Sequence, residues 1–218
     1  MSTNHRLFGK KSSSLRVHME EETAVTQLSE QLYSFTEVHN KRDLVIVCIG
    51  TDRSTGDSLG PLIGSKLEAA NLKRFHVYGT LEKPVHAVNL EDRLAEIKDN
   101  HHRPFILAID ACLGRMNSVG KISLAEGPVQ PGAAVQKKLP SIGDIHMTGI
   151  VNIGGMMEYF VLQNTRLHTV MQMAERMAET IIQTDQILPE KQATSASLLQ
   201  TLRLKPSMIL RSKNETPM

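Results

Sequence analysis

The sequence predicts an α/β fold, a three-layer α/β/α domain with a mostly parallel sheet. Residues 44–49 and 105–109 are short apolar runs rich in β-branched side chains, a composition typical of strands buried on both faces. Segments with helical spacing of apolar residues alternate with these runs. This β-α-β-α-β order favours parallel strands joined by right-handed crossovers.

The first expected helix covers one face of the sheet. Residues 25–35 carry one apolar stripe, formed by Val25, Leu28, Leu32 and Phe35. The first strand, residues 44–49, leads into a glycine-punctuated turn over residues 50–58. A second helix is expected after it, with Pro61 at its first position, where a missing N–H costs little.

The second half of the domain repeats this pattern. Residues 75–80 predict a second strand, and Asn89 is the expected cap of a helix with apolar Leu90, Leu94 and Ile97. The strand at residues 105–109 ends at Asp110. Residues 121–125 predict a further strand, and residues 127–155 a Gly/Pro-rich loop able to wall a cleft. The last expected helix has the stripe Leu167, Val170, Met171, Ala174, Met177, Ala178, Ile181 and Ile182.

Length and composition indicate one folded domain. The chain has 218 residues, 40% of them hydrophobic, which is enough for one sizeable core and crowded for two. We expect a flexible basic arm at residues 1–19, a single α/β domain at 20–188 and a basic, Ser/Thr-rich tail at 189–218. Two cysteines, Cys48 and Cys112, make no disulfide framework and fit a reducing cytoplasm.

Charge and hydropathy exclude two classes of partner. The net charge of +2 comes from basic terminal segments around an acidic central part, aromatic residues make up 4% of the chain and Trp is absent. A nucleic-acid binder usually carries its basic patch on the folded body, so nucleic acid is not expected as a partner. No apolar run approaches the roughly 18 residues of a membrane span, so no membrane partner is expected either.

Two aspartates follow predicted parallel strands at the same edge of the sheet. Asp57 lies in the turn after the first strand, and Asp110 follows the strand at residues 105–109. Two carboxylates at this edge can share a proton and activate water, or they can hold a divalent cation. The structural alternative is that Asp57 caps a helix and Asp110 belongs to a turn.

His146 is the best histidine candidate. It lies in the glycine-rich region, which could close over the edge that carries the two aspartates. A neutral imidazole there could complete a metal site or carry protons, and the alternative is an ordinary hydrogen-bonded loop histidine. His101 and His102 precede a strand at the opposite end of the sheet and are expected on the surface.

Two familiar motifs fit poorly. Residues 50–58 are similar to a phosphate-binding loop, but Asp57 replaces the lysine and would repel phosphate. Residues 56–59 spell GDSL, the signature of esterases in which the serine, here Ser58, is the nucleophile. That motif should close the first strand directly, whereas six residues intervene here. Its Asp-x-x-His partner is found only at residues 99–102, at the wrong end of the sheet.

The residues around the two aspartates resemble known motifs. The pattern Gly50-x6-Asp57-x-Leu59-Gly60-Pro61 resembles the first motif of the germination-protease and hydrogenase-maturation endopeptidase superfamily. Residues 109–111, Ile-Asp-Ala, resemble its second acidic motif. The resemblance covers roughly residues 43–183 and implies a phosphorylase/hydrolase-like fold. Over its whole length, the chain resembles a spore protease of endospore-forming bacteria.

This resemblance implies roles for three residues. Asp57 matches an acid that contacts a metal in the maturation endopeptidases and is catalytic in the germination proteases, and Asp110 matches the second acid. His146-x-x-Gly149 resembles the motif that supplies a third metal ligand. Asp57, Asp110 and His146 are therefore the candidate catalytic residues and candidate ligands of a divalent metal ion, and no other cofactor is expected. Thr51 replaces an Asn that is common in the family.

The expected function is hydrolysis of a protein substrate by an endopeptidase in the cytoplasm of a sporulating cell. One aspartate would take a proton from water while the other stabilises the oxyanion or the leaving amine. One alternative is a catalytically inactive peptidase-fold scaffold that binds a sporulation partner. Another is a GDSL-type serine esterase.

Overall fold

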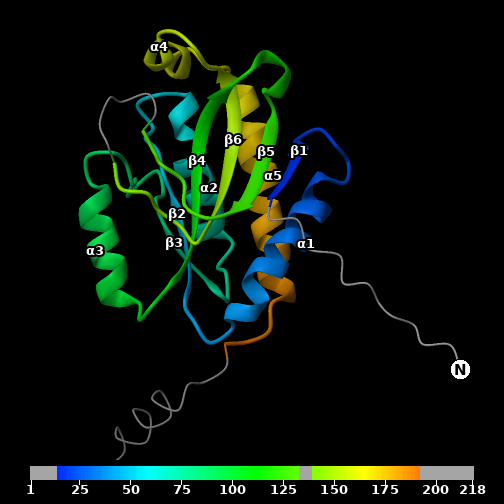
Figure 1. Cartoon of the computed structure of the whole chain (residues 1–218), viewed down its shortest axis with the longest axis vertical. Coiled ribbons are helices and arrows are strands. Elements are labelled where there is room, and N and C mark those ends of the chain that lie inside the picture. Colours follow the sequence, from blue (N-terminus) through cyan, green and yellow to red (C-terminus); the bar gives the residue numbers. More distant parts are fainter. Residues whose placement is uncertain (1–13, 133–138, 192–218) are drawn as a thin grey trace, which may run out of the picture.

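The computed structural model describes residues 14–132 and 139–191 of the chain. Figure 1 shows a sheet with helices on both faces. The strands are β1 (Ser14–His18), β2 (Leu44–Cys48), β3 (Phe75–Tyr78), β4 (Phe105–Gly114), β5 (Lys121–Glu126) and β6 (Ile145–Ile153). The α-helices are α1 (Ala24–Thr36), α2 (Leu59–Ala69), α3 (Leu90–Asn100), α4 (Glu158–Gln163) and α5 (Leu167–Ile187). Three one-turn 3₁₀ helices are η1 (Glu37–His39), η2 (Gly56–Ser58) and η3 (Met116–Ser118).

The sheet is mixed but mostly parallel, as predicted. Its strand order is β1-β5-β6-β4-β2-β3. The strands β6, β4, β2 and β3 run parallel, whereas β5 is antiparallel to both β6 and β1. The crossovers between parallel strands bring the carboxyl ends of β2 and β4 to one edge of the sheet.

Both faces of the sheet are buried, which gives the three layers. In β2, Leu44, Ile46 and Cys48 belong to the core beneath α1, α2 and α5. The alternating residues Val45 and Val47 join a second core with Leu90 and Ile97 of α3. Strands buried on both faces read as continuous apolar runs, and this explains why the sequence predicted β2 correctly.

The first strand begins within the segment expected to be a flexible arm. Residues 14–18 form β1 and pair with β5, so the prediction of an arm is wrong for these residues, and residues 1–13 lie outside the described part. The Arg16 side chain donates a hydrogen bond to Ser123 Oγ across this pair.

The Gly/Pro-rich region contains a central strand. Residues 127–155 were expected as a loop, but Ile145–Ile153 form β6 between β4 and β5. Gly149 is one of the glycines that favoured a loop. In the structure it lies within the strand and allows close packing, because a Cβ there would overlap the Met173 sulfur and crowd Leu59. His146 consequently belongs to a strand.

Two further differences concern the site. Strand β4 continues to Gly114, so Asp110 lies inside it, one residue beyond the last pair with β2. Helix α2 begins at Leu59 after η2, so Pro61 is its third residue, still within the first turn where helix N–H groups lack partners. The short helix α4 follows the region predicted as loop, in a stretch for which no element was predicted.

The end of α5 is tied to the rest of the domain. The Asp185 carboxylate near the end of α5 accepts hydrogen bonds from the backbone N–H groups of Lys73 and Arg74 at 2.8 Å. Beyond α5, the Pro189 carbonyl accepts a hydrogen bond from Arg74, and residues 192–218 of the expected tail lie outside the described part. None of the described helices is long and apolar enough to cross a membrane.

Helix α2 packs with its backbone directly against the sheet. A Cβ on Gly60 would overlap the Ile49 carbonyl oxygen, and one on Gly64 would overlap the Gly79 carbonyl oxygen. Backbone atoms cannot yield as a flexible side chain does. The two glycines therefore set the distance between α2 and the strand ends.

We expect Gly60→Ala to lower the free energy of unfolding by about 2–3 kcal/mol because the helix must shift away from β2. Glu68→Ala, on the exposed side of the same helix, should change it by no more than about 0.5 kcal/mol. Urea unfolding of the three proteins measures both effects. Equal stability of Gly60→Ala and the unchanged protein would contradict the close approach.

Candidate active site

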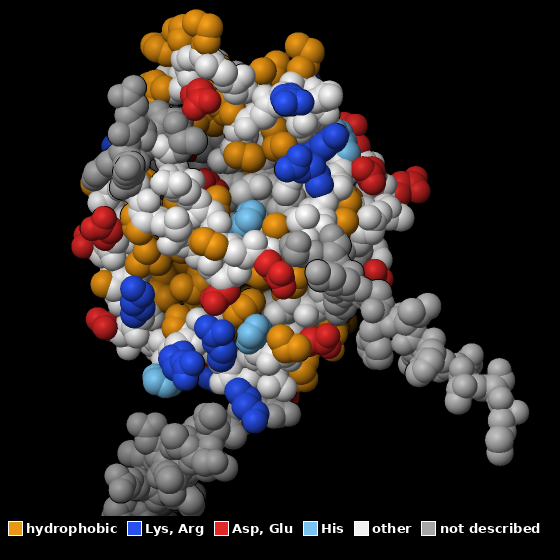
Figure 2. All heavy atoms as spheres, viewed as in Figure 1, with side chains coloured by type: hydrophobic (Ala, Val, Ile, Leu, Met, Phe, Trp, Pro, Cys, Tyr) orange, Lys and Arg blue, Asp and Glu red, His pale blue; other side chains and the backbone are white. Residues whose placement is uncertain are grey.

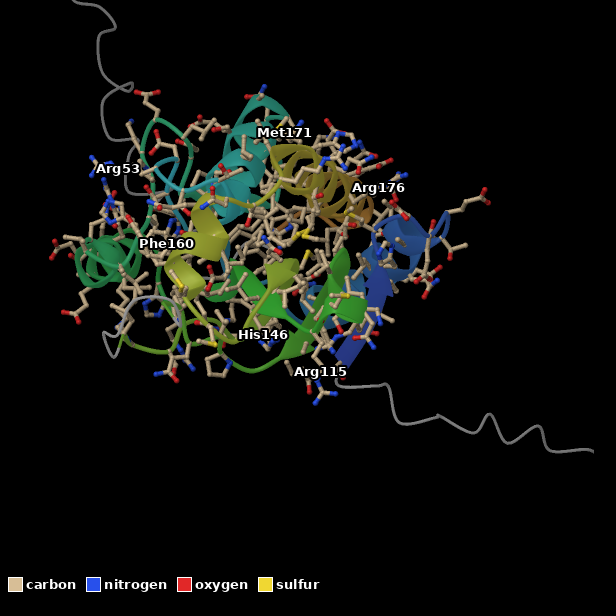
Figure 3. All side chains as sticks on the ribbon, turned by 90° about the horizontal axis from the view of Figure 1, so that it is seen from above. Arg53, Arg115, His146, Phe160, Met171 and Arg176 are labelled. Atoms are coloured by element: carbon tan, nitrogen blue, oxygen red, sulfur yellow. The ribbon has the colours of Figure 1, made fainter. Side chains whose placement is uncertain are left out.

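A cleft of about 490 Å³ lies at the carboxyl edge of β2 and β4. Its walls are the turn after β2, the loop before α3, the end of β4, residues 129–132 and helix α4. In Figure 3, which looks down from above, the labelled Arg53 of the turn and Phe160 of α4 lie on the same side of the molecule. Both predicted aspartates, Asp57 and Asp110, line this cleft.

Asp57 is held by a turn that folds back onto the end of β2. The Asp57 carbonyl oxygen accepts a hydrogen bond from the Thr51 N–H at 3.1 Å. Gly50, at φ 147°, makes this possible because a Cβ there would overlap that same oxygen. Asp57 itself lies in η2, so its backbone is held in place above the edge of the sheet.

Asp110 reaches the cleft from the strand interior. Side chains alternate between faces along a strand, so Asp110 points to the same face as Ala108, the face that α3 covers. Its strand partner on β6 is Thr148, which also lines the cleft. Thr148 could not be recognised as a site residue from the sequence, because its place in the cleft depends on the pairing register of β6, which was expected to be a loop.

The two carboxyl groups share a buried site in which it is unfavourable for both to be ionised at once. Some Asp110 surface is open to the cleft, yet burial, followed by the negative charge of Asp57, raises the pKa of Asp110 to about 8. Burial also raises the pKa of Asp57. Near neutral pH, the more strongly shifted Asp110 therefore keeps its proton while Asp57 is the better candidate for the ionised partner.

Ser54 supplies a further polar group beside Asp57. Ser54 lowers the pKa of Asp57 and so opposes the larger effect of burial, which raises it. The Ser54 hydroxyl does not form a hydrogen bond of good geometry with Asp57. Ser54 is 5% exposed, lines the cleft, and its Oγ is the one buried side-chain polar atom without a partner within residues 14–132 and 139–191. A buried hydroxyl of this kind is ready to bind a group that enters the cleft.

His146 does not join the aspartates. It is paired with Ala108, two residues before Asp110 on β4, and it is absent from the cleft lining. Its Nδ1 lies 2.9 Å from the Gly127 carbonyl oxygen. Figure 3 places the labelled His146 away from Arg53, with α4 between them. The prediction that His146 faces the cleft is wrong because it assumed a loop where β6 fixes the register.

The residues also do not assemble the predicted metal site. Within the described ranges, Asp57, Asp110 and His146 do not bring their ligand atoms within 4.8 Å of one another. The carboxylates are suitable oxygen ligands, but the third ligand implied by the resemblance is engaged elsewhere. We therefore assign the two aspartates no metal-dependent step.

Neither Ser58 nor Cys112 is set up as a nucleophile for this cleft. The Ser58 hydroxyl is buried and donates a hydrogen bond to the Thr55 carbonyl at 2.7 Å, and Ser58 is not part of the cleft lining. Cys112 lines the cleft, but burial and the neighbouring Asp110 raise its pKa to about 11. A thiol with that pKa stays protonated and is a poor nucleophile near neutral pH.

Comparison with known proteins identifies relatives. Residues 16–180 match the model of a family described as Protein of unknown function (DUF1256). The chain is 56% identical over 162 residues to the Uncharacterized protein YyaC of Bacillus subtilis (strain 168), covering 74% of this chain and 79% of that one. This is the protein to which the whole-chain resemblance pointed.

Two solved structures are similar in a more distant way. The NiFe hydrogenase maturation protease HycI from Thermococcus kodakarensis KOD1 is 16% identical, with a TM-score of 0.48, and the match covers 72% of this chain and 99% of that chain. The Hydrogenase 3 Maturation protease is 17% identical, with a TM-score of 0.43, and the match covers 71% and 99%.

The raised pKa of Asp110 predicts a pH-dependent stability difference. Between about pH 4 and 8, the folded state keeps a proton that the unfolded state releases, so unfolding becomes easier as pH rises. The stability of the unchanged protein relative to Asp110→Asn should therefore fall across this range, by at most about 1.4 kcal/mol per pH unit. Urea unfolding at several pH values measures this.

Asp99→Asn, an exposed change on α3, provides the control and should give no such slope. In an Asp57→Asn background, the slope should end at a lower pH, because the like charge that raises the pKa of Asp110 is gone. A flat difference for Asp110→Asn would show that this carboxyl titrates normally.

Proposed function

The chain belongs to the DUF1256 family, and we propose that it is a peptidase that hydrolyses a protein substrate with Asp57 and Asp110. One observation carries the proposal: the two carboxyl groups line the same cleft, and burial together with the negative charge of Asp57 favours the protonated form of Asp110. Pairs of this kind divide the roles of acid and base in hydrolysis.

The proposed reaction uses the two groups in turn. The Asp57 carboxylate takes a proton from water as the water oxygen attacks the carbonyl carbon of the peptide bond. Protonated Asp110 donates a hydrogen bond to the developing oxyanion and then gives its proton to the leaving nitrogen as the C–N bond breaks. The proton on Asp57 then returns to Asp110, which restores the starting state.

A protein substrate is supported by the surface beside the cleft. Large apolar side chains on and just before α4 are exposed: Met156, Met157, Tyr159 and Phe160. Figure 2 shows hydrophobic side chains gathered over α4 at the top of the molecule. Exposed apolar patches beside a cleft are typical of sites that bind another chain. The motif resemblance around Asp57 supports a peptide bond as the target.

The same patch also favours the second candidate function, a scaffold that binds a sporulation partner without cleaving it. Both proposals place the protein in the cytoplasm of a sporulating cell, which we infer from the sequence resemblance. They differ in what the aspartates do. A scaffold binds its partner regardless of Asp57, whereas the peptidase loses turnover when that carboxyl group is changed.

We expect Asp57→Asn and Asp110→Asn each to reduce cleavage of a quenched-fluorescent peptide library by at least about 100-fold, because general acid–base catalysis contributes this much. Asp99→Asn, the same chemical change on the exposed face of α3, should retain full activity. Circular dichroism would establish that all three variants fold. Unchanged turnover in both site variants would favour the scaffold.

The pair also predicts the pH dependence of activity. The value of kcat/KM should fall above about pH 8, where Asp110 loses the proton that it must donate. It should also fall on the acid side, where Asp57 becomes protonated. Initial rates from about pH 4 to pH 10 would reveal this bell, and a rate that keeps rising through pH 9 would contradict the assignment of Asp110 as the acid.

A further inference from the structure

A second cluster of metal-ligating side chains lies at the opposite edge of the sheet. Asp43 directly precedes β2, His76 is the second residue of β3, and His101 directly follows α3. Their ligand atoms all lie within 4.8 Å of one another. Among the described residues, this is the one group of three or more His, Cys, Asp or Glu side chains with such spacing.

The distances within the cluster suit a small cation. Asp43 Oδ1 lies 3.7 Å from His76 Nε2, and Asp43 Oδ2 lies 3.4 Å from His101 Nδ1. A tetrahedral zinc ion with ligands at 2.0–2.1 Å separates those ligands by about 3.3–3.4 Å. Small rotations of the side chains would therefore close the cluster around such an ion.

The buried histidine has the support that a metal ligand needs. His101, expected on the surface, is only 9% exposed, and its Nε2 lies 3.0 Å from the Tyr78 hydroxyl. With that nitrogen engaged by Tyr78, Nδ1 faces Asp43. Metal-binding histidines are commonly oriented in this way by a partner on the second ring nitrogen.

We propose that Asp43, His76 and His101 form a binding site for a zinc ion, separate from the catalytic cleft. Two imidazoles with one carboxylate suit zinc and exclude magnesium, which prefers oxygen ligands. The His76 side chain is 52% exposed, so the fourth coordination position is open to water. A bound ion would join the starts of β2 and β3 to the end of α3.

Lys191 competes with the ion for this site. Its Nζ lies 2.5 Å from Asp43 Oδ1 and neutralises the carboxylate when no metal is bound. Arg74 adds positive charge nearby, and Figure 2 shows Lys and Arg side chains gathered at this lower end of the molecule. Zinc must displace the Lys191 ammonium, so removing that charge should strengthen binding.

The test is isothermal titration calorimetry of the full chain with zinc chloride, with magnesium chloride in parallel. His76→Gln and Asp43→Asn should weaken zinc binding at least about 10-fold, Tyr78→Phe should weaken it by about 10-fold, and Lys191→Gln should strengthen it. His102→Gln, an exposed change beside the cluster, should leave it unaltered. Cobalt bound at the same place should give the visible absorption of tetrahedral coordination.

The catalytic cleft is tested separately with the double variant Asp57→Asn, Asp110→Asn, which should bind zinc as the unchanged protein does. His76 is half exposed, so His76→Gln should fold, and its unfolding curve without metal provides the check. Zinc binding that survives His76→Gln, that depends on the cleft aspartates, or that is no tighter than magnesium binding would overturn the proposal.

Discussion

The candidate site depends on the close backbone contact between residues 50–60 and the end of β2. Gly50 and Gly60 have no space for a Cβ, because the carbonyl oxygens of Asp57 and Ile49 occupy those positions. This contact fixes η2 above the sheet edge. Since β4 continues beyond Ile109, its last pair with β2, Asp57 and Asp110 reach the same cleft from different elements.

The candidate cleft contains polar groups whose surroundings destabilise the fold. A buried carboxyl group beside a like charge disfavours ionisation, and the raised pKa of Asp110 records that unfavourable environment. The unpartnered Ser54 hydroxyl is a second such group in the same wall. The opposite edge of the sheet differs, because there the Asp43 carboxylate pairs with Lys191 and lies 3.4 Å from His101 Nδ1. Buried ionisable or polar groups that lack stabilising partners and cluster in one cleft are typical of a functional site.

The sequence predicted those parts of the molecule whose signal is local. Strand β2 and helix α5 were predicted because their apolar patterns are continuous, and Asp57 because a glycine-rich turn follows a strand. The position of His146 could not be predicted, because β6 contains a glycine required by Met173, a residue distant in sequence. The burial of His101 likewise depends on Tyr78 from another element. Pairing register and helix packing decide these positions, and neither leaves a local pattern.

The pairing of β1 with β5 has a consequence for the order of folding. The contact between Arg16 and Ser123 spans 107 positions, and the contact between Ser29 of α1 and Gln183 of α5 spans 154. During synthesis, β1 and α1 leave the ribosome long before their partners exist, whereas β2, β3 and β4 can already pair with one another. The amino-terminal elements are therefore made first, but they can dock onto β5 and α5 only after those later elements have been made.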